Sequence, residues 1–329
     1  MATMRDVALR AGVSTATVSH VLNNSGRVTV EIHTRVVEAI RELNYQPNNV
    51  ARALRTQRSQ LVSLVIPDLA NHFYAILARG VQDTLKPRGY HVMLGNTDYE
   101  RLEEEYFLRT AALQHAAGVI VLPFRLDTAT ARQLCGPDLP VVQIGRPIGD
   151  AILPYVYANN VGGAQQAVTY LLEQGRQRIA HIGGLPDTPP ARERWQGYVQ
   201  AHRNVGIEPD PRLHITADFL RTGGETAMRS LLEKGLQPDA VFAANDLMAL
   251  GALHVLHQAG IRVPEEIAVI GFDDIDEAEF AEPSLTTVHQ PTYDIGRHAA
   301  ELLLMHIDQQ APASNHMILP CTFVRRFSA

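Results

Sequence analysis

From residue 61 onward the chain alternates short apolar runs with segments long enough to form helices, and this alternation limits the possible folds most. The runs are apolar without interruption, unlike a strand with one solvent-exposed face. Such strands belong to parallel sheets whose two faces are both covered by helices. The eight runs, which suit two sheets better than one, are LVSLVIP, YHVMLGN, GVIVLP, PVVQIG, RIAHIGG, DAVFAAN, IAVIGFDD and LTTVHQP. We therefore expect an α/β region built on two parallel sheets.

We expect the two sheets to form separate lobes that are discontinuous in the sequence. The sequence of the first lobe is interrupted near "YVYANN". The helical segment "VGGAQQAVTYLLEQG" that follows is expected to be the first helix of the second lobe. The late helical segment "YDIGRHAAELLLMHI" is expected to return to the first lobe. The predicted N-terminal lobe therefore combines residues 61–158 with residues 289–329, and the predicted C-terminal lobe comprises residues 159–288.

Residues 1–46 show a helical pattern instead. Thr3 and Asp6 have the spacing of a capping box in front of a short helix, which a glycine ends. After a turn of only three residues, Ser14 can cap a second helix. Thr29 can cap a third, amphipathic helix, which completes a small core. The pattern predicts an all-α helix-turn-helix headpiece, and a three-helix bundle with no role beyond folding is the alternative.

The side of the second helix that faces away from this core favours a DNA partner. Hydroxyls and an imidazole can bond to base edges in a major groove, and a methyl group can contact thymine. Residues 1–58 also hold eight arginines against four acidic residues, a net charge of about +4, whereas the rest carries about −10. The residues on this side are small or polar, without a long acidic side chain: Thr15, Ala16, Thr17, Ser19 and His20.

Residues 47–60 follow the headpiece and contain a short stretch of helix formers, "NVARALR". An isolated helix of fewer than about 12 residues is rarely stable in water, so this one needs a partner to fold. A polar linker between domains is the alternative. Leu54 between Arg52 and Arg55 favours a hinge helix, whose leucine enters a minor groove while the arginines lie beside phosphates.

Together, "MATMRDVALRAGVSTATVSHVLNN" and "RELNYQPNNVARALRTQ" resemble the headpiece and hinge of the LacI/GalR family, and the similarity extends through essentially the whole chain. The resemblance implies a transcriptional repressor that binds a palindromic operator in double-stranded DNA as a homodimer. It also implies a periplasmic-binding-protein-like, two-lobed effector domain, in which a small molecule controls DNA affinity. The positions that contact the operator in that family match Thr15, Ala16, His20, Asn23, Tyr45 and Leu54.

Polar residues follow several of the predicted strands, at the ends where ligands bind in open α/β sheets. Each could simply cap the next helix, as Asn245 could in front of "LMALGALHVLHQAG". Their convergence on one cleft between the lobes explains them together. The predicted effector residues are these polar groups, aromatic side chains and an arginine that the family resemblance implies: Arg146, Asn245, Asp273, Gln290, Phe73, Tyr74, Phe219 and Arg192.

The predicted effector is a sugar or sugar-like metabolite. An arginine, an asparagine and an aspartate beside flat aromatic rings suit the vicinal hydroxyls of a sugar. Gly145 and Arg146 stand where many relatives carry an aspartate, and Thr188 stands near where a purine-responsive relative has an arginine. Whether the effector induces or corepresses stays open.

Other functional classes find less support in the sequence. The motifs GxGxxG, GxxxxGK[ST], GxSxG and HExxH do not occur, so we expect no enzyme activity. Cys135 and Cys321 lie far apart without metal-ligand spacing, and we expect no cofactor or metal. Without an apolar run of membrane-spanning length or an export signal, the chain is expected in the cytoplasm, at the nucleoid. A solute-binding protein of the same two-lobed fold, without a DNA role, is the alternative.

Overall fold

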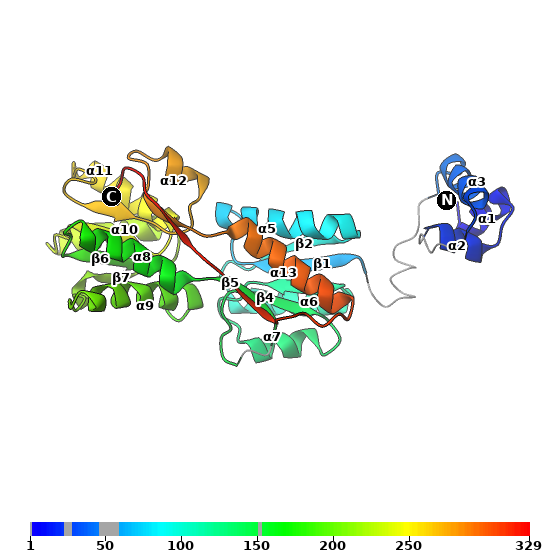
Figure 1. Ribbon diagram of the computed structural model, residues 1–329, viewed down its shortest axis with the longest axis horizontal. Helices are drawn as coiled ribbons and strands as arrows, with labels where there is room; N and C mark the ends of the chain where they lie inside the picture. Colours follow the sequence, from blue (N-terminus) through cyan, green and yellow to red (C-terminus); the bar gives the residue numbers. More distant parts are fainter. Residues whose placement is uncertain (1, 23–27, 46–58, 151–152) are drawn as a thin grey trace. The chain divides into compact units, whose positions relative to one another are not determined.

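The structure is a computed structural model, and it describes residues 2–22, 28–45, 59–150 and 153–329. The chain divides into two compact units, residues 1–59 and residues 60–329. The first unit contains the headpiece, and we call the second the α/β unit. Figure 1 colours the helices and strands of both along the sequence.

The headpiece forms around valines from each of its helices. The predicted capping box is present, because Thr3 Oγ1 accepts the backbone N–H of Asp6 and the Asp6 carboxylate accepts that of Thr3. Gly12 has a φ of 64°, the left-handed conformation that ends the first helix and allows a sharp turn. The described helices are α1 (Met4–Ala11), α2 (Thr15–Leu22) and α3 (Val30–Glu42). The fully buried valines are Val7, Val18 and Val36.

The first lobe of the α/β unit contains a parallel sheet with the strand order β11-β5-β4-β3-β1-β2. Helix α13 lies along α5 and contacts β3, β4 and β5, so it brings a late part of the sequence back to this lobe (Figure 1). The strands are β1 (Leu61–Ile66), β2 (His91–Asn96), β3 (Gly118–Val121), β4 (Val141–Ile144), β5 (Tyr155–Ala158) and β11 (His316–Leu319). The helices are α5 (His72–Leu85), α6 (Arg101–Leu113), α7 (Thr128–Cys135) and α13 (Thr292–Ile307).

The second lobe contains a shorter parallel sheet with the order β7-β6-β8-β9. Helix α8 packs on α9, and α10 packs on α11. The strands are β6 (Ile179–Gly183), β7 (His214–Thr216), β8 (Ala240–Ala243) and β9 (Ala268–Ile270). The helices are α8 (Asn160–Glu173), α9 (Pro189–Asn204), α10 (Arg221–Glu233), α11 (Asp246–Gln258) and α12 (Asp276–Phe280).

The prediction that "LTTVHQP" joins a parallel sheet holds only for two isolated parallel bridges, Ile270–Thr286 and Asp273–His289, beside the end of β9. This run forms β10 (Thr287–His289), which pairs antiparallel with β12 (Thr322–Val324) in a small separate sheet. A short apolar run indicates that a strand is buried, but not whether the neighbouring strand runs parallel or antiparallel to it. Here the partner comes from the end of the chain, where the sequence has too few apolar residues in a row to predict a strand.

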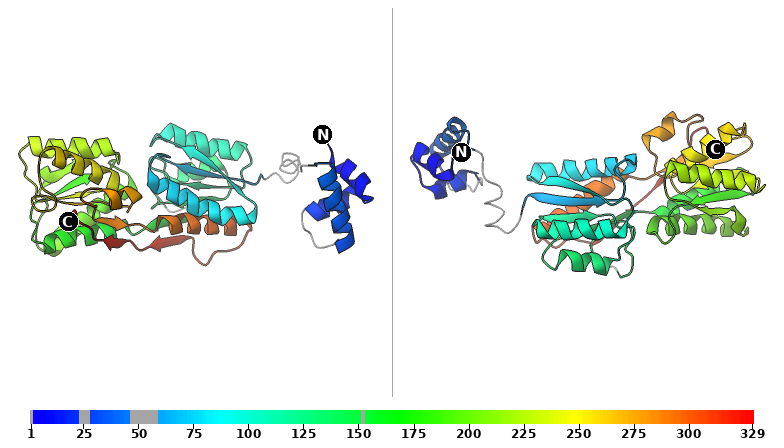
Figure 2. Two further views of the ribbon diagram at one scale, coloured as in Figure 1. Left: turned by 90° about the horizontal axis from the view of Figure 1, so that it is seen from above. Right: turned by 180° about the vertical axis from the view of Figure 1, so that it is seen from behind.

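The last residues of the chain pack on the second lobe, so the expected boundary at residues 289–329 is too simple. The ring of Phe323 lies 4.9 Å from that of Tyr170 on α8. Ser328 Oγ donates to the carbonyl of Val269 at 2.6 Å and accepts the N–H of Thr286 at 2.8 Å. The chain therefore crosses between the lobes after β5, after β10 and after β11 (Figures 1 and 2).

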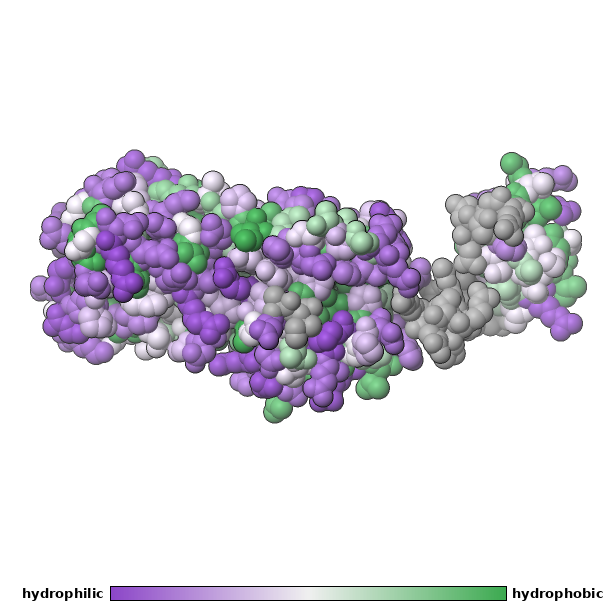
Figure 3. All heavy atoms as spheres, turned by 60° about the horizontal axis from the view of Figure 1, so that its bottom comes forward, coloured by the Kyte–Doolittle hydropathy of each residue, from purple (hydrophilic) through white to green (hydrophobic). Residues whose placement is uncertain are grey.

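Apolar side chains of the α/β unit concentrate in buried clusters, one of which joins residues of both lobes. The face seen in Figure 3 is mainly hydrophilic, with scattered apolar residues. No described helix is both long and apolar enough to span a bilayer. Within the same described residues, no group of His, Cys, Asp and Glu side chains is arranged to hold a metal ion.

Candidate DNA-binding and effector sites

The outward side of α2 is composed of small and polar side chains. Thr15, Ala16 and His20 are exposed, whereas Val18 and Val21 are buried in the headpiece core. This arrangement places the predicted base-reading groups on the solvent side of the helix. Because the exposed side chains are short at the start of α2, a groove of duplex DNA can approach the helix backbone closely.

Other predicted DNA-binding residues are less accessible. Thr17 is half-buried, and its hydroxyl lies 2.9 Å from that of Ser14, which also accepts the backbone N–H of Thr17. Tyr45 is only 9% exposed and packs with the headpiece core. The sequence predicted a contact with DNA for this residue but no part in the core. The remaining predicted positions lie outside the described residues: Asn23, Arg52, Leu54 and Arg55.

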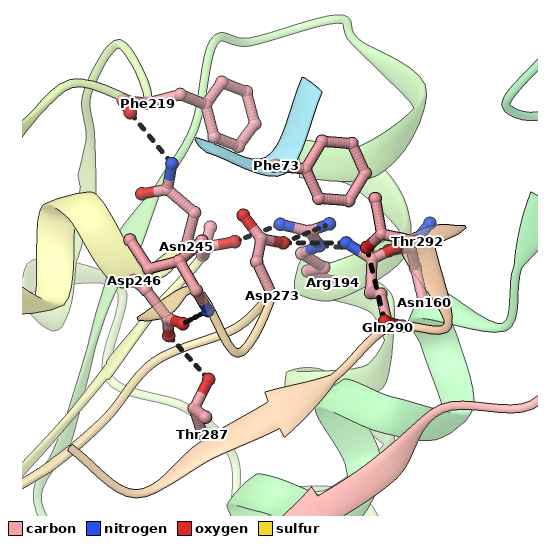
Figure 4. A network of polar contacts seen from close by, with 12 residues as sticks. Phe73, Asn160, Arg194, Phe219, Asn245, Asp246, Asp273, Thr287, Gln290 and Thr292 are labelled. Atoms are coloured by element: carbon pink, nitrogen blue, oxygen red, sulfur yellow. Dashed lines mark hydrogen bonds and ion pairs between the residues drawn. The ribbon is translucent and has the colours of Figure 1, made fainter. Parts of the chain in front are cut away.

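A cavity in the α/β unit is lined by residues of both lobes. Tyr157 and Ala158 reach it from the end of β5 in the first lobe, and Asn245 reaches it from the end of β8 in the second. Figure 4 shows the polar network on its second-lobe side. The structure brings together seven of the eight predicted effector residues: Phe73, Tyr74, Arg146, Phe219, Asn245, Asp273 and Gln290.

A buried ion pair between Arg194 and Asp273 dominates this network (Figure 4). Arg194 Nη2 lies 3.3 Å from Asp273 Oδ1, and Gln290 Nε2 donates to the same oxygen at 2.7 Å. Arg194 Nε donates to Asn160 Oδ1 at 3.0 Å, and the guanidinium lies 3.9 Å from the centre of the Phe272 ring. Burial raises the pKa of Asp273 to about 6, while Arg194 and Gln290 act to lower it.

The structure does not place Arg192 at the cavity, where it was expected as an effector residue. Arg192 is exposed and does not line the cavity, whereas Arg194 is buried and does. Both belong to α9, where each residue turns the helix by about 100°, so two positions reverse the direction of a side chain. The segment "ARERWQGY" does reach the cavity, but through Arg194 and not through Arg192.

A second ion pair connects the two lobes at the cavity. Arg146 follows β4 in the first lobe and Glu193 lies on α9 in the second, with 2.6 Å between Arg146 Nε and Glu193 Oε1. Asn160 Nδ2 donates to Glu193 Oε2 at 2.8 Å, and Arg146 Nη2 donates to the hydroxyl of Tyr157 at 2.9 Å. Burial raises the pKa of Glu193, while Asn160 and Arg146 act to lower it.

Asn245 caps α11 as well as lining the cavity. Its Oδ1 accepts the N–H of Met248 at 2.9 Å, and its Nδ2 donates to the carbonyl of Phe219 at 2.8 Å. The capping role that the sequence left open for Asn245 is therefore present. The second bond holds Phe219, whose ring occupies the space that a Cβ atom at Gly184 would need.

Aromatic rings from both lobes form the apolar side of the cavity. The ring of Phe124, in the first lobe, lies 5.0 Å from that of Tyr99 and 6.1 Å from that of Phe219 in the second lobe. Phe73 and Tyr74 make an edge-to-face contact at 5.1 Å. A flat ligand ring has apolar surface to contact here, opposite the network of charges and amides.

The sequence interpretation missed several lining residues, among them Asn160, Glu193 and Phe124. Asn160 follows β5 as the other polar residues follow their strands, so the same signal could have found it. Instead, "YVYANN" was interpreted only as a lobe boundary. Glu193 resembles an ordinary surface charge on a helix, because its partner Arg146 comes from a distant segment.

Comparisons with known proteins connect this geometry to a family. Residues 3–48 match the family described as "Bacterial regulatory proteins, lacI family", and residues 168–329 match the "Periplasmic binding protein-like domain". The chain is 38% identical to the HTH-type transcriptional repressor CytR of Escherichia coli, over 99% of this chain and 96% of the relative. It is also 38% identical to the ribose operon repressor of Escherichia coli, over the full length of both.

The solved structures that resemble the whole chain include the following two. The Lac repressor dimer bound to operator and the anti-inducer ONPF has a TM-score of 0.89 at 27% identity, covering 99% of this chain and 98% of that one. The complex of the transcriptional regulator CelR with cellobiose has a TM-score of 0.77 at 38% identity, covering both chains completely. With both regions and full-length relatives in agreement, this chain belongs to the LacI family of DNA-binding transcriptional regulators.

Proposed function

We propose that this chain is a repressor that binds a near-palindromic operator as a homodimer, and that a sugar or sugar-like metabolite in the cavity controls its affinity for DNA. One observation carries the proposal: a single chain combines the exposed polar side of α2 with a cavity where charged and amide side chains of two lobes converge. Relatives named as a ribose operon repressor and a CelR–cellobiose complex support a sugar, and the Lac repressor dimer on its operator supports a dimer.

In this proposal the headpiece, residues 1–46, reads DNA through α2. Thr15, Ala16 and His20 contact base edges, because they are exposed on one side of the helix. A two-fold dimer places two such helices in half-sites about one helical turn apart. Residues 47–60 would serve as the hinge. The proposed contacts to the sugar-phosphate backbone and the central minor groove are Thr17, Asn23, Tyr45, Arg52, Leu54 and Arg55.

The effector would lie between the N-terminal lobe and the C-terminal lobe, residues 159–288. Arg194, Asp273 and Gln290 offer donors and acceptors for vicinal hydroxyls, and the neighbouring rings of Phe73 and Phe219 offer apolar surface. Because the proposed target is chromosomal DNA, we propose that the protein acts in the cytoplasm, at the nucleoid. We propose no catalytic role.

Selection from fragmented genomic DNA, followed by footprinting at moderate salt, tests this function. The full-length protein should enrich a near-palindromic site, and a His20→Ala, Thr15→Ala double variant should lose that preference. A panel of sugars should contain one that shifts the operator affinity of the wild type but not that of Arg194→Met. If the wild type prefers no fragment over random duplex, with and without the panel, the proposed function is wrong.

A further inference from the structure

We propose that the effector of this protein is an uncharged, polyhydroxylated ring compound, and that the Arg146–Glu193 ion pair excludes phosphorylated and acidic analogues. This inference rests on the proposed function and names the chemical class of its effector. It follows from the charges at the cavity and from the helix ends that face it.

The charged side chains of the cavity balance one another. Among the described residues that line it, the charged ones are Arg146, Glu193, Arg194 and Asp273. They form the pairs Arg146–Glu193, with 2.6 Å between nitrogen and oxygen, and Arg194–Asp273, with 3.3 Å. Each arginine is thus neutralised by a carboxylate that is itself buried. A ligand phosphate would face these two carboxylates without an unpaired cation to compensate for its own desolvation.

The two guanidinium groups also use part of their N–H groups on protein partners. Arg194 donates to Asn160 and to the carbonyl of Ala244 besides contacting Asp273. Arg146 donates to the hydroxyl of Tyr157 and lies against the ring of the same tyrosine. Bidentate recognition of a phosphate or carboxylate needs two parallel guanidinium N–H groups. On Arg194 all three nitrogens already contact Asn160, Ala244 or Asp273, and on Arg146 the Nε atom faces Glu193, so an anion competes with these partners.

Three helix ends at the cavity are also partly blocked as anion sites. Helix α9 begins with Pro189 and Pro190, which both line the cavity, so the first two positions of the helix lack an N–H group. At α5 the side chain of Asn71 accepts the N–H of Phe73. At α11 the side chain of Asn245 occupies the N–H of Met248. At each of these three helix ends, part of the set of N–H groups that usually holds a phosphate is therefore missing or already bonded within the chain.

Calorimetry on the full-length protein with paired probes tests the inference. The pairs are ribose with ribose 5-phosphate, uridine with uridine 5′-monophosphate, and cellobiose with cellobionate, and inorganic phosphate serves as a probe independent of the effector's identity. For any pair that binds, the wild type should prefer the uncharged member by about tenfold or more. Inorganic phosphate should give no saturable binding.

Glu193→Gln should reverse this exclusion, because it leaves Arg146 with an uncompensated charge. We expect saturable phosphate binding in Glu193→Gln and its loss in the double variant with Arg146→Met. Glu233→Gln, which removes an exposed charge at the end of α10, is the matched control and should behave as the wild type. If Glu193→Gln does not fold, Pro190→Ala restores one N–H group to α9 and should give a weaker gain of the same kind.

The outcomes separate this inference from the proposed function. Saturable phosphate binding by the wild type that Arg146→Met removes, or preference for the charged member of a pair, would overturn the inference. So would a folded Glu193→Gln variant that gains no phosphate binding. If no sugar of the panel binds, the sugar effector of the proposed function fails, yet the phosphate titrations still decide whether the cavity excludes anions.

Discussion

Glu104 shapes the proposed effector cavity without reaching it. This fully buried carboxylate on α6 accepts the backbone N–H of Phe124 at 2.7 Å, that of Leu126 at 2.9 Å, and that of Arg125 between them. The bonds fix the loop that brings Phe124 to the cavity. Glu104→Gln keeps the shape but turns an acceptor into a donor facing N–H groups. We expect a loss of about 1–3 kcal/mol of unfolding free energy and several-fold weaker effector binding.

Urea unfolding and calorimetry check this prediction. Glu103→Gln is the control, because Glu103 is exposed and precedes Glu104 on the same helix, and it should alter neither quantity by a measurable amount. Unchanged effector affinity in a destabilised Glu104→Gln variant would mean that packing alone positions Phe124.

His181 makes the stability of the second lobe sensitive to acid. Its Nδ1 lies 2.9 Å from that of His214, its Nε2 is buried without a partner among the described residues, and its ring packs near Trp195, Tyr198 and Phe242. Burial, and second the neighbouring His214, lower the pKa of His181 well below the ordinary 6.5. Below pH 6.5, His181 therefore binds a proton in the unfolded chain but stays neutral in the folded chain. The free energy of unfolding falls as the pH falls.

His181→Phe removes this proton uptake and keeps an aromatic ring in the stack. The variant should lose less stability than the wild type between neutral pH and mildly acidic pH. Thermal unfolding of both proteins across that interval measures how much stability each one loses. Carboxyl groups present in both proteins contribute equally, so their effect cancels when the two losses are subtracted. Equal slopes would show that His181 takes up its proton in the folded protein as readily as in the unfolded chain.

Single residues of the cavity were predictable where the local sequence carried the signal. Asp273 and Gln290 follow apolar runs, so their place at strand ends could be expected. The choice between Arg192 and Arg194 depends on which side of α9 is buried. Both arginines flank Glu193, and three charged residues in a row do not show which side of a helix faces the core. Glu193 could not be assigned, because its burial depends on a side chain from the other lobe.

At the scale of elements, helices α5 and α13 meet through glycines. A Cβ atom at Gly80 would lie 2.1 Å from the carbonyl oxygen of Tyr293 and 3.0 Å from the backbone nitrogen of Arg297. Helix propensity alone would make Gly80→Ala stabilising by about 1 kcal/mol. The clash with the backbone of α13 should reverse the sign and cost about 1–3 kcal/mol. Urea unfolding measures the change.

Ala75→Gly provides the control for this contact, because Ala75 is exposed on the same helix. It should cost about 1 kcal/mol through propensity alone. If Gly80→Ala instead stabilised the protein, α13 would have to move away from α5 at little cost, and the close contact would not be needed for the first lobe.

The pattern of elements was predictable because most strands are buried on both faces and lie between amphipathic helices. The apolar runs at β1, β3 and β8 are of this kind, and each is fully or almost fully buried. Strand β5 was not predicted, because its mostly buried segment was interpreted only as the lobe boundary. Strands β7, β11 and β12 were not predicted either. These last three are edge or crossover strands with exposed or half-buried positions, so their sequences lack an unbroken apolar run.

At the scale of the whole molecule, each unit has its own core. The headpiece residues cluster around Val7, Val18 and Val36, and the buried clusters of the α/β unit contain only residues of that unit. The chain crosses between the two lobes of the α/β unit three times, after β5, β10 and β11, so three connecting segments join the lobes. An effector bound between the lobes can therefore change the relative position of the lobes at all three crossings together. The headpiece does not take part in this change through packing, because it has a separate core.

Coupling between effector and operator must then be reciprocal, since both ligands bias one equilibrium of the protein. We expect the active sugar to change operator affinity by a factor between about 5 and 150, and operator to change sugar affinity by the same factor. Fluorescence titrations of each ligand, with the other absent and saturating, give both factors. Arg194→Met should bind operator as the wild type does and give a factor of one. If both ligands bind the wild type and each leaves the other's affinity unchanged, the cavity does not control DNA binding.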